Sequence, residues 1–135
     1  MKVIGLYGRS NCGKTSTLNL LIDLLEEKTT GCKKPSPQNN VCDRRETISF
    51  NGKIVSICTA GDNENQLNEN IKYFNKTNPD VAVSATRTSG KTCTELKQYA
   101  TKQSCDVDWI KKIYSSIGAE NKDNLKQTND ILNKI

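Results

Sequence analysis

The chain has 135 residues, of which 34% are hydrophobic and 26% are charged, and its mean hydropathy is −0.67. This length is typical of one domain with a modest core, and no run approaches the roughly 20 apolar residues that a membrane-spanning helix needs. The net charge of +5 comes without a dense basic stripe, so it suits a polyanionic small ligand and gives no direct signal for nucleic-acid binding.

The chain has six cysteines and no histidine. No leader-like apolar segment opens the sequence, so we expect free thiols in a reducing cytoplasm rather than a disulfide framework. The lack of histidine excludes catalysis by a His base, and the lack of a Cys-x-x-Cys pair argues against a structural zinc site. We therefore expect one cytoplasmic domain, residues 1–135, that does not associate with a membrane.

The first expected elements are a short buried strand over 3–7 and an amphipathic helix from about 13 to 28. The buried face of this helix is marked by apolar residues at i, i+3, i+4 and i+7, namely Leu18, Leu21, Ile22 and Leu25. A loop over 32–45 follows, and its two prolines and paired asparagines are typical of irregular structure. Loops of this length often carry function.

A hairpin is predicted next, because Asn51-Gly52 separates two β-rich runs, 47–50 and 54–57. Asn63-x-x-Gln66 is a capping pair for a helix over 64–76. The inward face of that helix is expected to carry its apolar residues, Leu67, Ile71 and Phe74.

A buried strand over 81–85 and a helix over 92–102 follow, and Thr92-x-x-Glu95 resembles a capping box at the start of that helix. A last strand is expected around 107–113. A terminal helix is suggested by the spacing of Leu125, Thr128, Leu132 and Ile135. Strands that alternate with helices predict an α/β fold whose sheet is mostly parallel, with the hairpin adding one antiparallel edge strand.

One segment carries a complete chemical motif. Gly8-Arg9-Ser10-Asn11-Cys12-Gly13-Lys14-Thr15 matches G-x-x-x-x-G-K-[ST]. The glycines let consecutive N–H groups point into one concavity, and the start of the next helix favours phosphate. Lys14 supplies a positive charge for the β- and γ-phosphates, and Thr15 supplies a hydroxyl for Mg²⁺. The alternative is a glycine turn that only joins a strand to a helix.

With an apolar strand before this motif and a Leu-rich helix after it, the first 30 or so residues resemble the P-loop NTPase superfamily. The resemblance implies a three-layer α/β sandwich that binds a nucleoside triphosphate with Mg²⁺. Further along the chain, Cys58-Thr59-Ala60-Gly61-Asp62 resembles the small GTPase pattern in which a strand ends in Asp-Thr-Ala-Gly. The resemblance implies that these residues form the phosphate site: Gly8, Arg9, Ser10, Asn11, Cys12, Gly13, Lys14, Thr15, Ser16 and Gly61.

The sequence departs from the GTPase pattern in two ways. Cys58 stands where the Mg²⁺-linked aspartate is expected, and a thiol is a poor ligand for a hard cation. The guanine-reading pattern Asn-Lys-x-Asp is also absent, so ATP is expected ahead of GTP. Asp62 is the substitute expected to bind metal or activate water, and a helix N-cap is the alternative role for its carboxylate. By the same resemblance, Thr47 and the loop over 32–46 occupy the place of a nucleotide-sensing switch, in which Arg44, Arg45 and Glu46 either act or are simply solvated.

A second segment, Ala85-Thr86-Arg87-Thr88-Ser89-Gly90-Lys91-Thr92, repeats the first motif with alanine in place of the first glycine. Either it is a second phosphate cradle, or it is a coincidental strand-to-helix turn that brings Arg87 and Lys91 near the first site. In P-loop folds the strand at this place lies beside the first strand, so the resemblance implies that it lies beside strand 3–7. In the second case Arg87 would then approach developing charge on a γ-phosphate as an arginine finger does. A solvated Arg87 is the alternative.

These features predict a P-loop protein that binds ATP, or else GTP, with Mg²⁺ and hydrolyses it or transfers its phosphoryl group. Lys14, Asp62 and Arg87 are the candidate catalytic residues, and Thr15 and Asp62 are the candidate metal ligands. A nucleotide switch or binding module without significant turnover is the second hypothesis. The short chain leaves little room for an acceptor domain, so a protein partner or a homodimer is expected.

Overall fold

The computed structural model describes residues 1–9, 13–30, 43–113 and 120–135. In these residues, strands and helices alternate in the expected order β-α-β-β-α-β-α-β-α. The elements are β1 (Lys2–Tyr7), α1 (Lys14–Thr30), β2 (Arg45–Phe50), β3 (Lys53–Cys58), α2 (Glu64–Thr77), β4 (Val81–Thr86), α3 (Lys91–Lys102), β5 (Val107–Lys111) and α4 (Glu120–Leu132).

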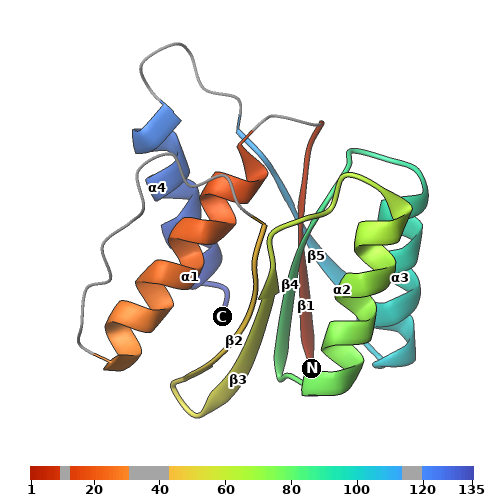
Figure 1. Ribbon diagram of the computed structural model, residues 1–135, viewed down its shortest axis with the longest axis horizontal. Helices are drawn as coiled ribbons and strands as arrows, with labels where there is room; N and C mark the ends of the chain where they lie inside the picture. Colours follow the sequence, from red (N-terminus) through yellow and green to blue (C-terminus); the bar gives the residue numbers. More distant parts are fainter. Residues whose placement is uncertain (10–12, 31–42, 114–119) are drawn as a thin grey trace.

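The five strands form one sheet in the order β2-β3-β4-β1-β5. β1 runs parallel to both β4 and β5, β3 runs parallel to β4, and β2 is the antiparallel edge strand of the hairpin. The prediction of a mostly parallel sheet with one antiparallel edge strand is therefore confirmed. Because β1, β3, β4 and β5 point the same way, their carboxyl ends meet at one edge, which lies at the top of Figure 1.

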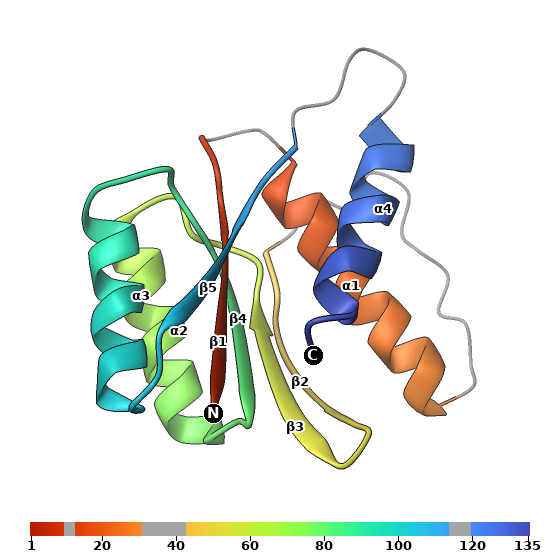
Figure 2. The same cartoon turned by 180° about the vertical axis from the view of Figure 1, so that it is seen from behind.

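Helices cover both faces of the sheet. α1 and α4 pack on one face and α2 and α3 on the other, so the molecule has three layers (Figures 1 and 2). Side chains of β1 alternate between the two faces: Ile4 and Leu6 join the core under α1, whereas Val3 joins the core under α2 and α3. Leu18, Leu21, Ile22 and Leu25 are all fully buried, as their spacing predicts.

The start of α2 agrees with its capping signal. The side chain of Asn63 accepts a hydrogen bond of 2.9 Å from the backbone N–H of Gln66, so Asn63 is the N-cap. The side chain of Gln66 accepts a bond of 2.7 Å from the backbone N–H of Asp62. Asp62 therefore does not cap the helix, and its carboxylate takes another partner.

The prediction that Thr92 and Glu95 form a capping box at the start of α3 is wrong. The N-cap is Gly90, which has no side chain to cap with, and the helix begins at Lys91. The hydroxyl of Thr92 instead accepts a 3.0 Å hydrogen bond from the backbone N–H of Arg87, because the turn after β4 folds back on the first turn of the helix.

The terminal helix begins at Glu120, and Leu125 is 50% exposed rather than inward-facing. The inward face is largely polar, because Asn124 and Thr128 find partners on α1. The Thr17 hydroxyl donates to the Asn124 side-chain oxygen at 3.1 Å, and the Thr128 hydroxyl donates to the Thr17 carbonyl at 3.0 Å. No helix among the described residues is long and apolar enough to cross a bilayer.

Candidate functional site

The glycine-rich motif over residues 8–15 begins at the carboxyl end of β1 and ends in the first turn of α1. Gly8 is held against the neighbouring strand, where its backbone N–H donates to the Thr86 carbonyl at 3.2 Å. Gly13 has φ of +91°, a conformation that glycine adopts without strain, and its carbonyl accepts the first helical hydrogen bond, from Thr17. Ser10, Asn11 and Cys12 lie outside the described residues.

Lys14 has the most hydrogen-bond acceptors that the structure gives to a described side chain of the motif. It is only 5% exposed, and its ammonium group has three acceptors. Nζ donates to the Gly8 carbonyl at 2.7 Å, to the Thr86 carbonyl at 2.8 Å and to Asp62 Oδ1 at 3.0 Å. A buried ammonium needs such partners, because an unpaired charge away from water is costly. The charge therefore lies between the ends of β1, β3 and β4.

The hydroxyl of Thr15, the next residue, points toward the carboxylate of Asp43 and not toward that of Asp62, the predicted metal ligand. Its hydroxyl lies 3.4 Å from Asp43 Oδ1 and 3.4 Å from the Thr59 carbonyl. These three groups present only oxygen atoms, which are the ligands that Mg²⁺ prefers. No group of three or more Cys, Asp or Glu with metal-ligating geometry occurs among the described residues, so any Mg²⁺ here would rely on few protein ligands.

Sequence reasoning missed Asp43, although the hairpin carried a signal for it. The register that pairs Arg45 with Cys58 continues for one more step, where the Thr59 N–H donates to the Arg44 carbonyl at 3.0 Å. The Arg44 N–H donates in return to the Thr59 hydroxyl at 2.7 Å. Counting back from the Asn51-Gly52 turn would have placed Asp43 beside this strand end.

Gly61 has a packing role. A Cβ atom on it would lie 1.9 Å from the Ala85 carbonyl oxygen, so only glycine lets this turn approach the end of β4. Asn70 supports the same turn, because its side-chain amide donates to the Ala60 carbonyl at 2.7 Å and to the Ser84 hydroxyl at 3.1 Å. This close approach positions Asp62, the next residue, opposite Lys14.

Cys58 is fully buried at the end of β3. Burial raises the pKa of its thiol from 9.0 to about 12, although the nearby Arg45 lowers it. The thiol therefore stays protonated at neutral pH. A neutral buried thiol is unsuited to bind Mg²⁺, so the position where the GTPase pattern has its aspartate is a core position in this chain.

The second motif-like segment follows β4, and β4 lies beside β1 as expected. Its glycine, Gly90, has φ of +92°, close to the value at Gly13. The lysines of the two segments differ, however. The side chain of Lys91 is 79% exposed and forms an ion pair of 3.4 Å with Glu64 on α2, whereas Lys14 is buried. Arg87 is exposed at the end of the strand.

The switch-like residues after the long loop have structural partners. Arg44 lies 2.9 Å from Asp23 and 3.8 Å from Glu46, so it ties β2 to α1. Arg45 donates to the Asn70 side chain at 3.1 Å, and Thr47 contacts the Tyr73 hydroxyl at 2.7 Å. Of the other predicted phosphate ligands, Arg9 is exposed after β1, and Ser16 is partly buried in the first turn of α1.

Two residues that lie beside Gly13 were also missed. A Cβ atom on Gly13 would lie 3.3 Å from Lys112 Cε and 3.5 Å from Asn124 Oδ1. Lys112 is only 1% exposed, and its ammonium group donates to the Ile113 carbonyl at 2.7 Å. A lysine within a predicted strand carries no signal that its side chain will lie beside a glycine 99 positions earlier.

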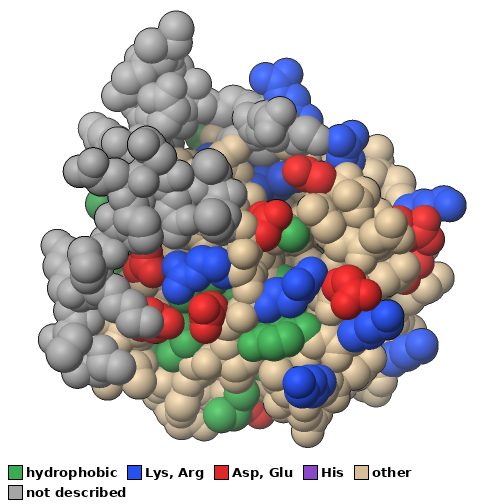
Figure 3. Space-filling model, in the orientation of Figure 1, with side chains coloured by type: hydrophobic (Ala, Val, Ile, Leu, Met, Phe, Trp, Pro, Cys, Tyr) green, Lys and Arg blue, Asp and Glu red, His purple; other side chains and the backbone are tan. Residues whose placement is uncertain are grey.

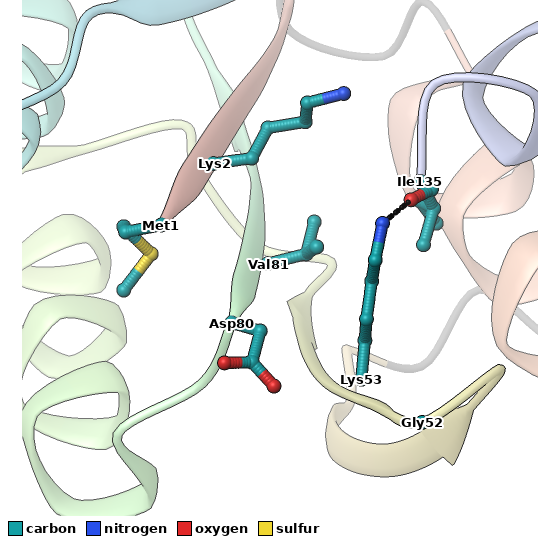
Figure 4. A pocket seen from close by; sticks show the side chains of 7 residues that line it. All are labelled: Met1, Lys2, Gly52, Lys53, Asp80, Val81 and Ile135. Atoms are coloured by element: carbon teal, nitrogen blue, oxygen red, sulfur yellow. Dashed lines mark hydrogen bonds between the residues drawn. The ribbon is translucent and has the colours of Figure 1, made fainter.

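The surface carries mixed charges and has a cavity away from the predicted site. Figure 3 shows acidic and basic side chains interspersed on the face it displays, without a continuous basic stripe among the described residues. A cavity of about 370 Å³ lies at the opposite edge of the sheet, where β1 and β4 begin (Figure 4). Lys53 crosses it to donate to the Ile135 carbonyl at 2.9 Å, and the cavity contains none of the predicted site residues.

Comparisons with family models, with curated proteins and with solved structures found no match to this chain.

Proposed function

We propose that the chain binds a nucleoside triphosphate together with Mg²⁺ at the edge of the sheet where β1 ends and α1 begins. The observation that carries the proposal is the placement of Lys14. Its buried ammonium group lies at the start of a helix, between two backbone carbonyls and the Asp62 carboxylate. Burial alone does not set Lys14 apart, because Lys112 is also buried; what supports phosphate binding is that Lys14 is held at a helix N-terminus, where anions are favoured.

The contacts of Lys14 indicate how a phosphate would be received. Two of its three acceptors are carbonyls that belong to fixed strand ends, and the third is the side chain of Asp62, which is 44% exposed. A phosphate oxygen that approached Lys14 would compete with the Asp62 carboxylate. Asp62 would then be released to face the metal or an attacking water.

The metal would be held by the oxygen atoms around Thr15. The Thr15 hydroxyl is the expected ligand, and the Asp43 carboxylate lies beside it. We keep Asp62 as the second candidate carboxylate. When bound, Mg²⁺ would neutralise charge on the β- and γ-phosphates. In this arrangement the carboxylate of Asp43 or Asp62 would take the role of the aspartate that the GTPase pattern has at position 58.

Hydrolysis or phosphoryl transfer is the proposed reaction, with Asp62 and Arg87 as its candidate catalytic residues. The second candidate function is a nucleotide switch without significant turnover. It is favoured by Cys58, whose neutral thiol cannot take the place of a metal-linked carboxylate. ATP is the proposed nucleotide because the sequence lacks the Asn-Lys-x-Asp pattern that reads guanine.

The binding proposal is tested by comparing Lys14→Ala with Lys91→Ala. The two lysines hold the same place in the two motif-like segments, but Lys91 is exposed and paired with Glu64. Several charged contacts to phosphate are lost in Lys14→Ala, so its affinity for a fluorescent ATP analogue is expected to fall about 100-fold or more. Lys91→Ala should bind as the unaltered protein does. Equal binding by both variants, or no binding of ATP or GTP by the unaltered protein with Mg²⁺, would overturn the proposal.

Turnover separates the two candidate functions. Phosphate release that is lost in Asp62→Asn or Arg87→Ala, while ATP binding persists, would support an enzyme. Binding of ATP without phosphate release in the unaltered protein would support a switch. ATP and GTP should be compared in the same assay, because the affinity ratio tests the proposed base preference directly.

A further inference from the structure

A second cavity lies at the same edge of the sheet as Lys14, on the face that α3 covers. Its volume is about 430 Å³, within the range of small-molecule sites. β1 and β5 contribute the aromatic side chains of Tyr7 and Trp109, and α3 with the turn before it contributes the other wall. Side chains alternate along β1, so Tyr7 points to the α3 side, away from α1 and the core that Leu6 joins.

The aromatic wall depends on a glycine in β1. Trp109 on β5 pairs with Gly5 on the neighbouring strand β1. A Cβ atom on Gly5 would lie 2.7 Å from Trp109 Cζ3. The indole ring therefore lies directly over the strand, where any larger residue would displace it. Tyr7 meets the indole edge-on, with ring centroids 6.0 Å apart and planes at 80°. Both rings are only partly buried, so they offer surface for a third ring to pack against.

The opposite wall is polar and carries positive charge. It consists of residues 88–90 and of three side chains on the first turns of α3, those of Cys93, Thr94 and Lys97. Lys97 is the only charged residue among the described lining residues, and none of them is acidic. Nothing lies within 4 Å of a Cβ atom built on Gly90, so the wall is open at that point.

We propose that this cavity binds a small aromatic anion, a planar ring that carries a negatively charged group. The ring would pack against Trp109 and Tyr7, and the anionic group would lie toward Lys97 and the hydroxyls of the α3 wall. Nucleoside monophosphates and aromatic carboxylates share this chemistry. None of the described residues of the motif over 8–15 lines this cavity, and the proposal does not depend on nucleotide binding at Lys14.

The chain offers a direct reporter, because Trp109 is its only tryptophan. We expect AMP or 4-hydroxybenzoate to change the tryptophan fluorescence in a saturable way, and comparison of the two distinguishes phosphate-bearing from carboxylate-bearing rings. Adenosine, a ring without charge, and inorganic phosphate, a charge without a ring, should bind at least about tenfold more weakly than AMP, because each lacks one of the two contacts. The same titration of Lys14→Ala should give an unchanged AMP affinity, which separates this cavity from the phosphate loop.

Two threonines of α3 provide matched variants. The Thr94 and Thr101 hydroxyls each donate to the carbonyl four residues earlier, but only Thr94 lines the cavity. Thr94→Phe should fill the cavity and reduce affinity about tenfold or more, whereas Thr101→Phe should leave it unchanged. Lys97→Gln should weaken AMP without weakening adenosine, and Lys102→Gln is its control on the same helix. The proposal is overturned if neither anion alters the fluorescence, if Lys14→Ala abolishes the response, or if Thr94→Phe and Thr101→Phe bind equally.

Discussion

Lys14 and Asp62 are 48 positions apart in the sequence, and their side chains meet with Nζ 3.0 Å from Oδ1. The lysine is buried and the carboxylate is 44% exposed, so the pair has one fixed member and one accessible member. Three features create this contact: the parallel pairing that brings the strand ends together, the close approach at Gly61, and the use of Asn63 rather than Asp62 as the helix cap.

The first prediction concerns this pair. If Asp62 neutralises Lys14 in the ligand-free protein, Asp62→Asn removes a competitor for the ammonium group. ATP binding without Mg²⁺ should then become several-fold tighter, because no carboxylate repels the incoming phosphate. If Asp62 also faces the metal, the enhancement of binding by Mg²⁺ should shrink. Titration calorimetry of the variant and the unaltered protein, each with Mg²⁺ and with EDTA, gives the four affinities needed.

The control for that experiment is Asp108→Asn, which removes a carboxylate from an exposed ion pair with Lys134. Exposed pairs of this kind contribute little, so this variant should reproduce both affinities of the unaltered protein, with Mg²⁺ and with EDTA. An Asp62→Asn protein with the same Mg²⁺-free affinity as the unaltered protein would show that Asp62 and phosphate do not compete for Lys14.

The second prediction concerns Asp43. Its carboxylate lies 3.4 Å from the Thr15 hydroxyl, so it can hold or orient a metal ligand in the nucleotide complex. Asp43→Asn should weaken Mn²⁺ binding in the presence of ATP about tenfold or more, the usual cost of losing a group that ligates or orients around a metal. Mn²⁺ binding measured by electron paramagnetic resonance would test this. Asp80→Asn alters a carboxylate at the opposite edge of the sheet, so it should leave Mn²⁺ binding unchanged.

Local signals in the sequence accounted for much of the fold. The Asn51-Gly52 turn, the Asn63 cap and the leucine spacing of α1 each depend on contacts within a few residues, and the structure confirms all three. The position of β4 beside β1 was also expected. The turn, the cap and the leucine spacing are readable because backbone geometry and helical periodicity fix them before distant parts of the chain meet, whereas the expected place of β4 came from the resemblance to P-loop folds.

The errors occur where a distant polar partner decides the outcome. Leu125 is exposed and Asn124 is buried on α4, because Thr17 on α1 hydrogen-bonds to Asn124 and to Thr128, and hydrophobic spacing cannot reveal such a polar partner. Thr92 resembled a helix cap, but its hydroxyl is taken by the backbone N–H of Arg87. The contact between Asp43 and Thr15 likewise arises only after the hairpin packs beside α1.

The third prediction concerns Gly61 and the turn that carries Asp62. Gly61→Ala would put a Cβ atom 1.9 Å from the Ala85 carbonyl oxygen, so the turn or β4 must move. We expect a loss of about 3 kcal/mol or more in the free energy of unfolding, at the upper end of the cost of overpacking. Urea denaturation followed by circular dichroism measures it.

Gly52→Ala is the matched control for that variant. Gly52 has φ of +77°, but nothing lies within 4 Å of a Cβ atom built on it. Its substitution therefore carries the backbone penalty alone, about 1 kcal/mol. A Gly61→Ala protein that lost no more stability than Gly52→Ala would show that the close approach to β4 is relieved without cost.

The fourth prediction concerns the pH dependence caused by Cys58. Burial raises the pKa of its thiol from 9.0 to about 12, so the unfolded chain loses this proton at lower pH than the folded chain. The stability that this difference provides is complete below pH 9 and is lost as the pH rises toward 12. Between those values the thiol contributes a slope of about −1.4 kcal/mol per pH unit to the free energy of unfolding.

Other groups titrate in the same range, including Tyr99, whose pKa burial also raises to about 12. The measurement is therefore the difference in slope between the unaltered protein and Cys58→Ala, from urea denaturation at several pH values from 8.5 to 11. The cavity left by the substitution lowers stability at every pH, whereas the slope should become shallower only above pH 9. Parallel slopes for the two proteins would mean that the Cys58 thiol ionises in the folded protein as readily as in the unfolded chain.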